Sequence, residues 1–220
     1  MISKFEHLDV LFNEVGKALD DKVHFYIIGG AVMLYHNLKT ATKDVDIVVD
    51  TQKEFIATEK TLKKIGFKTK LSTAEYQKFD LNQIFIREDF RIDLFQRTVC
   101  KGFMLSEGMK KRSKKIMELK NLTILLCSTT DIFMFKTFTE REGDIADCIS
   151  LVRSEIDWKE MLDEIGKQIA TSGNKIWITY IGERMDLLLE EGMNIPIIDK
   201  IDKMREEYFL RLEKEQKEKK

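Results

Sequence analysis

Apolar side chains in the first twenty residues recur every three or four positions, which is the spacing of one helix face. They are Phe5, Leu8, Leu11, Phe12, Val15 and Leu19. The pattern changes at residues 24–28, a short run of β-branched and aromatic side chains that is typical of a strand. Gly29 and Gly30 end this run, and residues 31–36 have helical composition. The sequence therefore predicts a helix, a strand, a glycine turn and a second helix.

Four further runs of β-forming residues predict strands. They cover residues 44–50, 81–86, 90–95 and 122–127. Only a short polar segment separates the second run from the third, so these two predict a hairpin. After the first run, Thr51 is followed three residues later by Glu54, the capping-box signature of a helix, which we expect to end at Gly66.

The pattern becomes helical after Ser128. Helical spacing covers residues 131–138, 145–153, 158–170, 175–190 and the stretch from Pro196 onward. We therefore predict a mixed α/β fold, with a sheet and flanking helices in a domain of residues 1–128 and a helical domain of residues 129–220.

Composition and charge argue against several classes of partner. The 220 residues carry 37 Lys and Arg against 38 Asp and Glu, a net charge of −1, so no global field attracts nucleic acid or an anionic membrane. The three cysteines have no CxxC spacing, and no stretch has the composition of a signal peptide or a membrane span. We expect a cytoplasmic protein with reduced thiols and no membrane partner.

One segment, residues 108–115, is densely basic and is predicted to be a loop. It could hold a triphosphate or an RNA backbone by Coulomb attraction. The alternative is a solvated loop without function, which the lack of interleaved aromatic residues favours.

Asp44 and Asp46 are candidate metal ligands. Residues two apart on a strand point to the same face, and paired carboxylates can hold a hard divalent cation together with substrate phosphates. Gly29 and Gly30 lie thirteen residues upstream of Asp44, between a strand and a helix. Glycines there let backbone N–H groups approach a polyphosphate. The alternatives are solvated aspartates and an ordinary tight turn.

Asp93 is the third candidate, in the middle of the predicted strand 90–95. It could complete a three-carboxylate metal site with Asp44 and Asp46 and serve as general base for an attacking hydroxyl. The alternative is an ion pair with Arg91, which lies on the same face of the strand.

These residues resemble a known superfamily. A glycine pair, a spacer of this length, a strand with Asp44-Val-Asp46 and a later strand aspartate are similar to the pattern of the DNA polymerase β type nucleotidyltransferases. Within that superfamily, residues 136–147 resemble the lysine, arginine and paired-aspartate motif of AbiEii-type stand-alone members. The glycine pair departs from the commoner Gly-Ser, so that position offers no hydroxyl to a phosphate.

The resemblance implies a nucleotidyltransferase fold and assigns roles in the second motif. Lys136 and Arg141 would bind the nucleotide, and Asp144 and Asp147 would support the site. From the residues alone, Lys136, Asp144 and Asp147 share one face only if the helix continues through Gly143.

The expected function is metal-dependent transfer of a nucleoside monophosphate from an NTP, with Mg²⁺ or Mn²⁺, to an acceptor hydroxyl. The acceptor is left open among tRNA or other RNA, a protein and a small molecule. Since several similar proteins are toxin or phage-defence components, a cognate antitoxin is a candidate partner. The alternatives are a catalytically inactive nucleotide- or protein-binding module, and an antitoxin-like or scaffold role of the helical half.

Overall fold

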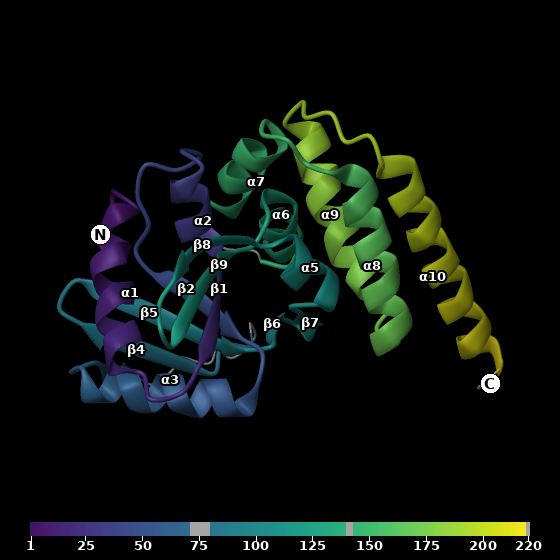
Figure 1. Cartoon of the computed structure of the whole chain (residues 1–220). Coiled ribbons are helices and arrows are strands. Elements are labelled where there is room, and N and C mark those ends of the chain that lie inside the picture. The colour runs from purple at the N-terminus through teal and green to yellow at the C-terminus, as the bar shows by residue number, and fades with distance from the viewer. Residues whose placement is uncertain (71–79, 140–142, 219–220) are drawn as a thin grey trace.

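The computed structural model describes residues 1–70, 80–139 and 143–218. The first part of the chain forms a mixed α/β unit (Figure 1). Its elements are α1 (Glu6–Ala18), β1 (Val23–Ile28), α2 (Gly29–Tyr35), β2 (Val45–Val49), α3 (Gln52–Lys64), β3 (Lys68–Lys70), β4 (Gln83–Arg87), β5 (Phe90–Gln96), β6 (Thr98–Cys100), β7 (Phe103–Met104), α5 (Glu107–Arg112), β8 (Lys114–Glu118) and β9 (Leu122–Leu126). The mixed α/β fold predicted from the sequence is confirmed.

Seven strands form one sheet, in the order β3-β4-β5-β2-β1-β9-β8. β2 pairs in parallel with β5 and antiparallel with β1. The predicted hairpin is present as β4 and β5, which pair antiparallel. β2 and β5 therefore lie side by side in the middle of the sheet, where each carries one of the candidate aspartates.

Local signals explain where the flanking helices begin. The side chain of Thr51 accepts a hydrogen bond from the backbone N–H of Glu54, and the Glu54 side chain accepts one from the backbone N–H of Thr51. This is the predicted capping box at the start of α3. α1 and α3 contact each other on one face of the sheet, whereas α2 lies against the opposite face and contacts α6 (Thr129–Thr137) (Figure 1).

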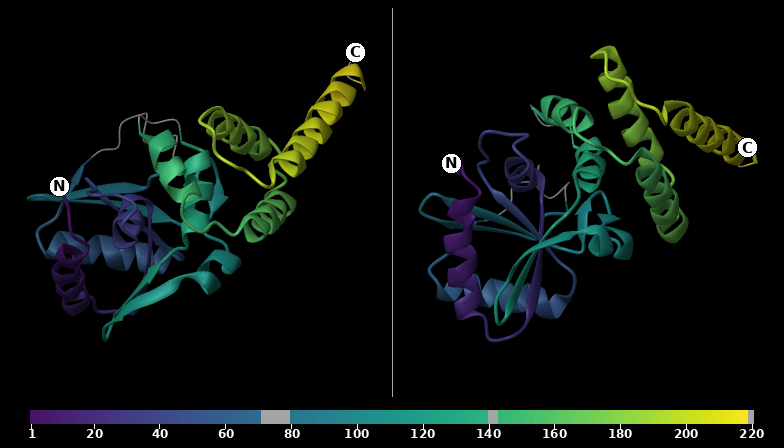
Figure 2. Two further views of the ribbon diagram at one scale, coloured as in Figure 1. Left: turned by 90° about the horizontal axis from the view of Figure 1, so that it is seen from above. Right: turned by 45° about the horizontal axis from the view of Figure 1, so that its top comes forward.

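Helices make up the rest of the described chain. They are α6, α7 (Asp144–Val152), α8 (Trp158–Ser172), α9 (Trp177–Glu190) and α10 (Ile198–Glu218). Trp177 at the start of α9 packs its indole edge-on against Phe103 of β7, which ties the later helices to the sheet unit. α10 packs along α9 and extends away from the sheet (Figure 2). The division into two domains at residue 128 stays a prediction.

The basic segment 108–115 differs from its prediction as a loop. Its first part lies in α5 and its last part in β8, an edge strand that pairs with β9. The side chain of Ser106 caps α5 by accepting a hydrogen bond from the backbone N–H of Met109. Among the described helices, none has the length and apolar character needed to cross a membrane.

Candidate active site

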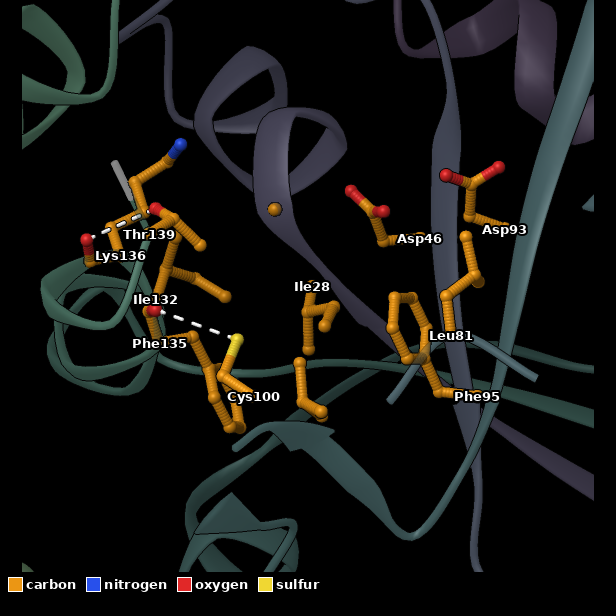
Figure 3. A pocket seen from close by; sticks show the side chains of 12 residues that line it. Ile28, Asp46, Leu81, Asp93, Phe95, Cys100, Ile132, Phe135, Lys136 and Thr139 are labelled. Atoms are coloured by element: carbon orange, nitrogen blue, oxygen red, sulfur yellow. Dashed lines mark hydrogen bonds between the residues drawn. The ribbon is translucent and has the colours of Figure 1, made fainter. Parts of the chain in front are cut away.

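Asp46 and Asp93 are register partners on the parallel strands β2 and β5. Partners in neighbouring strands point to the same face of a sheet, about 5 Å apart. Both carboxylates line one pocket, and Figure 3 shows them side by side on one wall of it. Asp93 is 3% exposed, whereas Asp46 is half-buried. The sheet thus brings together two of the three predicted catalytic and metal-binding residues.

Asp44 lies just before β2, where it is half-buried and outside the residues that line the pocket. The guanidinium of Arg91 is hydrogen-bonded to Asp93 and lies at the limit of ion-pair distance from Asp44. Nε and Nη2 of Arg91 each donate to an oxygen of Asp93 at 2.7 Å, and Nε is 4.0 Å from Oδ2 of Asp44. The ion pair that the sequence offered as the alternative role of Asp93 is therefore present.

The donor set suits a hard divalent cation. All three candidate ligands are carboxylates, and oxygen ligands are those that Mg²⁺ and Mn²⁺ prefer. Within residues 1–70, 80–139 and 143–218, however, no three His, Cys, Asp or Glu side chains lie close enough to hold an ion together. Shared metal binding by Asp44, Asp46 and Asp93 therefore stays a prediction, and it requires the carboxylates to move toward one another.

Gly29 and Gly30 form the first turn of α2 rather than a separate turn before it. Because Ile28 pairs with Asp46 across β1 and β2, the next residue, Gly29, lies directly beside the Asp46 carboxylate. Gly29 has a φ of +65°. At Gly30, an added Cβ would lie 2.5 Å from Oγ1 of Thr42. The backbone conformation thus favours glycine at position 29 and close packing requires it at position 30, and Gly29 also lines the pocket.

Lys136 reaches the pocket from the other side (Figure 3). It belongs to the last turn of α6 and is 6% exposed. Its Nζ lies 3.3 Å from Oδ1 of Asp144 and 2.7 Å from Oδ2 of Asp147, both in the first turn of α7. Nζ of Lys39, in the segment between α2 and β2, also donates to both oxygens of Asp147, at 3.0 and 2.8 Å.

Lys136 does not lie on one continuous helix with Asp144 and Asp147, which was the condition for these residues to share a helix face. α6 ends at Thr137 and α7 begins at Asp144, after Gly143 with a φ of +88°. Lys136 instead meets Asp144 and Asp147 because α7 packs against α6. Arg141, the other predicted nucleotide-binding residue, lies outside the described residues.

Charge pairing sets the ionisation of Asp147. Burial raises the pKa of its carboxyl group, but Lys136 and Lys39 together outweigh burial and hold that pKa below its usual value. Asp147 is therefore a carboxylate that holds two ammonium groups in place. Lys39 was not among the predicted site residues, because its partner lies 108 positions away in the sequence.

The remaining wall of the pocket is mostly apolar. Its side chains include those of Ile28, Leu81, Phe95, Val99, Ile132 and Phe135. Cys100 and Thr139 also line it, and neither was predicted. α9 fixes the segments that carry them: Trp177 donates to the carbonyl oxygen of Lys101 at 3.0 Å, and buried Arg184 donates to that of Thr139. The water-accessible space is about 50 Å³, below the roughly 300 to 1,000 Å³ of ligand sites.

Ion pairs occupy much of the basic segment 108–115. Lys110 pairs with Asp50 and Glu107, and Lys115 pairs with Glu118. Arg112 donates to Asp131, which is fully buried, and to Glu164 of α8. Much of its positive charge is thus balanced within the protein, and Arg112 connects α5 with α6 and α8.

Comparison with family models identifies the family of this chain. Residues 3–178 match the model of a family described as a nucleotidyltransferase of unknown function (DUF6036). The solution structure of the antibiotic-resistance factor ANT(2'')-Ia is similar with a TM-score of 0.47 and 10% identity, over 76% of this chain and 91% of that one. The crystal structure of ANT(2'')-Ia in complex with adenylyl-2''-tobramycin has a TM-score of 0.43 and 11% identity, over 83% and 99%. Curated proteins gave no match.

Proposed function

The chain belongs to the nucleotidyltransferase family whose model matches residues 3–178, and it is an enzyme of this class. On this premise we propose that it catalyses a metal-dependent reaction with an NTP. A nucleoside monophosphate passes from the NTP to an acceptor hydroxyl. The observation that carries the proposal is the pairing of Asp46 with Asp93 across β2 and β5, at a pocket that also contains Gly29 and Lys136.

The residues of the chain have distinct roles in this proposal. Lys136 binds the NTP phosphates by a charge-assisted contact, and the backbone at Gly29 and Gly30 lets the phosphates approach closely. Asp44, Asp46 and Asp93 hold Mg²⁺ or Mn²⁺, which neutralises charge on the phosphates and orients them when bound. Asp144 and Asp147 hold Lys136 in position.

The chemical step is a substitution at the α-phosphorus. The acceptor oxygen forms a bond to this phosphorus as the bond to the bridging oxygen breaks, and pyrophosphate leaves. Asp93 accepts the proton of the hydroxyl group as general base. Positioning and charge neutralisation account for most of the rate in such a step.

The pocket has to widen around the nucleotide, because its water-accessible space of about 50 Å³ is smaller than a small-molecule site. α6 and α7 form the side that carries Lys136, and α9 donates hydrogen bonds to the backbone carbonyls of Lys101, just after β6, and Thr139, just after α6. A shift of these helices against the sheet would open the pocket on the Lys136 side.

The acceptor is open among RNA, including tRNA, a protein hydroxyl and a small molecule. The purified protein is incubated with each α-labelled NTP, Mg²⁺ and a lysate divided into RNA, protein and small-molecule fractions. Label transferred to one fraction by the parent protein and not by Asp46→Asn would support the proposal. Metal-dependent NTP binding without transfer in any fraction would instead favour an inactive nucleotide-binding module.

We further propose a toxin or phage-defence role, with a cognate antitoxin as partner. This part of the proposal rests on the resemblance of residues 136–147 to AbiEii-type proteins. Expression of the parent protein and of Asp46→Asn in a host cell tests it. Growth arrest by the parent alone would support a toxin whose effect depends on nucleotidyl transfer. Equal growth of the two strains would argue against this role and leave the enzymatic proposal intact.

A further inference from the structure

Arg91 is hydrogen-bonded to one proposed metal ligand, Asp93, and lies near a second, Asp44. Its Nε and Nη2 each lie 2.7 Å from an oxygen of Asp93, and its Nε lies 4.0 Å from Oδ2 of Asp44. We propose that Arg91 is a built-in counter-ion that competes with the divalent cation for Asp93 and thereby sets the metal affinity of the site. This inference rests on the proposed function, because it assumes that a divalent cation binds these carboxylates.

The local structure of β5 explains the pair. Arg91 and Asp93 are two residues apart, so both side chains point to the same face of the strand. The side chain of Asp93 is only 4% exposed, and a carboxylate at such depth is costly without a cationic partner. Arg91 supplies that partner, and both oxygens of Asp93 accept a hydrogen bond from it.

A divalent cation needs the same oxygens. A guanidinium group and a metal ion bound to one carboxylate would be like charges a few ångströms apart, and they would repel strongly in a partly buried site. Arg91 at Asp93 therefore opposes metal binding, and displacement of Arg91 relieves this repulsion. The side chain of Arg91 is 24% exposed, which leaves it a route toward solvent.

Competition of this kind predicts two opposite effects of one substitution. In Arg91→Met, Asp93 loses a partner, so the metal-free protein should unfold at a lower temperature. The same change removes the competing charge, so Mn²⁺ should bind about tenfold more tightly, equivalent to about 1.4 kcal/mol. A merely structural role of Arg91 predicts the first effect without the second.

The test measures the thermal midpoint and the Mn²⁺ dissociation constant, by calorimetric titration with Mn²⁺ alone, for the parent and the variant. Arg87→Met is the matched control. Arg87 lies on the neighbouring strand β4 and forms a bidentate ion pair with Glu14 of α1, with N–O distances of 2.7 and 2.6 Å. Arg87 does not line the pocket. We expect this control to lower the midpoint and leave Mn²⁺ binding unchanged.

Arg91→Lys covers the case in which Arg91→Met does not fold. A lysine keeps the charge but not the two-point contact with both oxygens, so Mn²⁺ affinity should lie above that of the parent. Equal or weaker Mn²⁺ binding by the Arg91 variants, with a parent that binds Mn²⁺, would overturn the role of Arg91 and leave the proposed function standing. If neither parent nor variants bind Mn²⁺, the proposed metal site falls, and the role of Arg91 falls with it.

Discussion

The carboxylate of Asp46 occupies the space that a side chain at Gly29 would need. A Cβ added to Gly29 would lie 2.1 Å from Oδ2 and 3.0 Å from Cγ of Asp46. The φ of +65° at Gly29 lies in the left-handed region, which L-residues with a side chain adopt at a cost. Two independent constraints therefore demand glycine here, and one of them is the position of a proposed metal ligand.

We expect Gly29→Ala to abolish nucleotidyl transfer, because the new methyl group would push the Asp46 carboxylate from its place. The left-handed backbone alone should lower the free energy of unfolding by about 1 to 2 kcal/mol. Gly166→Ala is the control: nothing lies within 4 Å of a Cβ at this position in α8, and alanine should stabilise the helix by about 0.5 to 1 kcal/mol. Full activity of Gly29→Ala would contradict the assignment.

Asp46→Asn should abolish transfer while changing the thermal midpoint of the metal-free protein little or raising it. Asp46 lies next to Asp93, which already pairs with Arg91 in the metal-free protein, and removal of the Asp46 charge lowers the repulsion between the two neighbouring carboxylates. Asp50→Asn, just after the end of the same strand, removes the 2.6 Å ion pair with Lys110 and should leave activity unchanged. A large loss of stability in metal-free Asp46→Asn would instead identify Asp46 as a structural residue.

Features that depend on neighbouring residues were predictable from the sequence. The capping box of Thr51 and Glu54 and the β4–β5 hairpin follow from short patterns, and both are present. Local patterns also placed Asp46 and Asp93 on strands, but their juxtaposition depends on the parallel pairing of β2 with β5.

Features that depend on long-range packing were not predictable. The pairing of Asp147 with Lys39 spans 108 positions, and Arg112 meets buried Glu164 across 52 positions. The sequence left two roles open for Asp93, metal ligand and partner of Arg91, because both require the same strand face. The break at Gly143 was visible as a glycine, but the return of α7 onto α6 that restores the contact with Lys136 was not.

Lys136→Ala should weaken NTP binding, because one charge-assisted contact with the phosphates is lost. Such a contact contributes about 1.5 to 3 kcal/mol. Lys114→Ala is the control for loss of a lysine charge. Lys114 is exposed and donates to the hydroxyl of Tyr35 at 3.1 Å, so its removal should have a much smaller effect.

Calorimetric titration with a non-hydrolysable NTP and Mg²⁺ measures both lysine variants. Because Lys136 is buried against Asp144 and Asp147, Lys136→Ala should also be less stable, and the titration is performed well below its thermal midpoint. Equal NTP affinities of Lys136→Ala and the parent would show that Lys136 of α6 does not bind the nucleotide.

The charge network around Asp147 should make stability depend on pH in the acid range. Lys136 and Lys39 hold the pKa of Asp147 below its usual value against the opposing effect of burial. In the unfolded chain, the pKa of an aspartate is about 3.9. A lowered folded-state pKa stabilises the protein at pH values above the unfolded pKa, and this contribution is lost as the pH falls through the folded-state pKa.

Asp147→Asn should therefore be less stable than the parent at neutral pH, and the difference should shrink as the pH falls below about 4. Urea unfolding of both proteins at a series of pH values measures it. Asp163→Asn is the control, because the pKa of Asp163 is also lowered, first by its hydrogen bond with Lys159, but this pair is exposed at the surface. Added salt should reduce the stability change caused by Asp163→Asn far more than the change caused by Asp147→Asn, because Asp147 is mostly buried. A stability difference between Asp147→Asn and the parent that stays constant from neutral to acid pH would show that ionisation of Asp147 does not stabilise the fold.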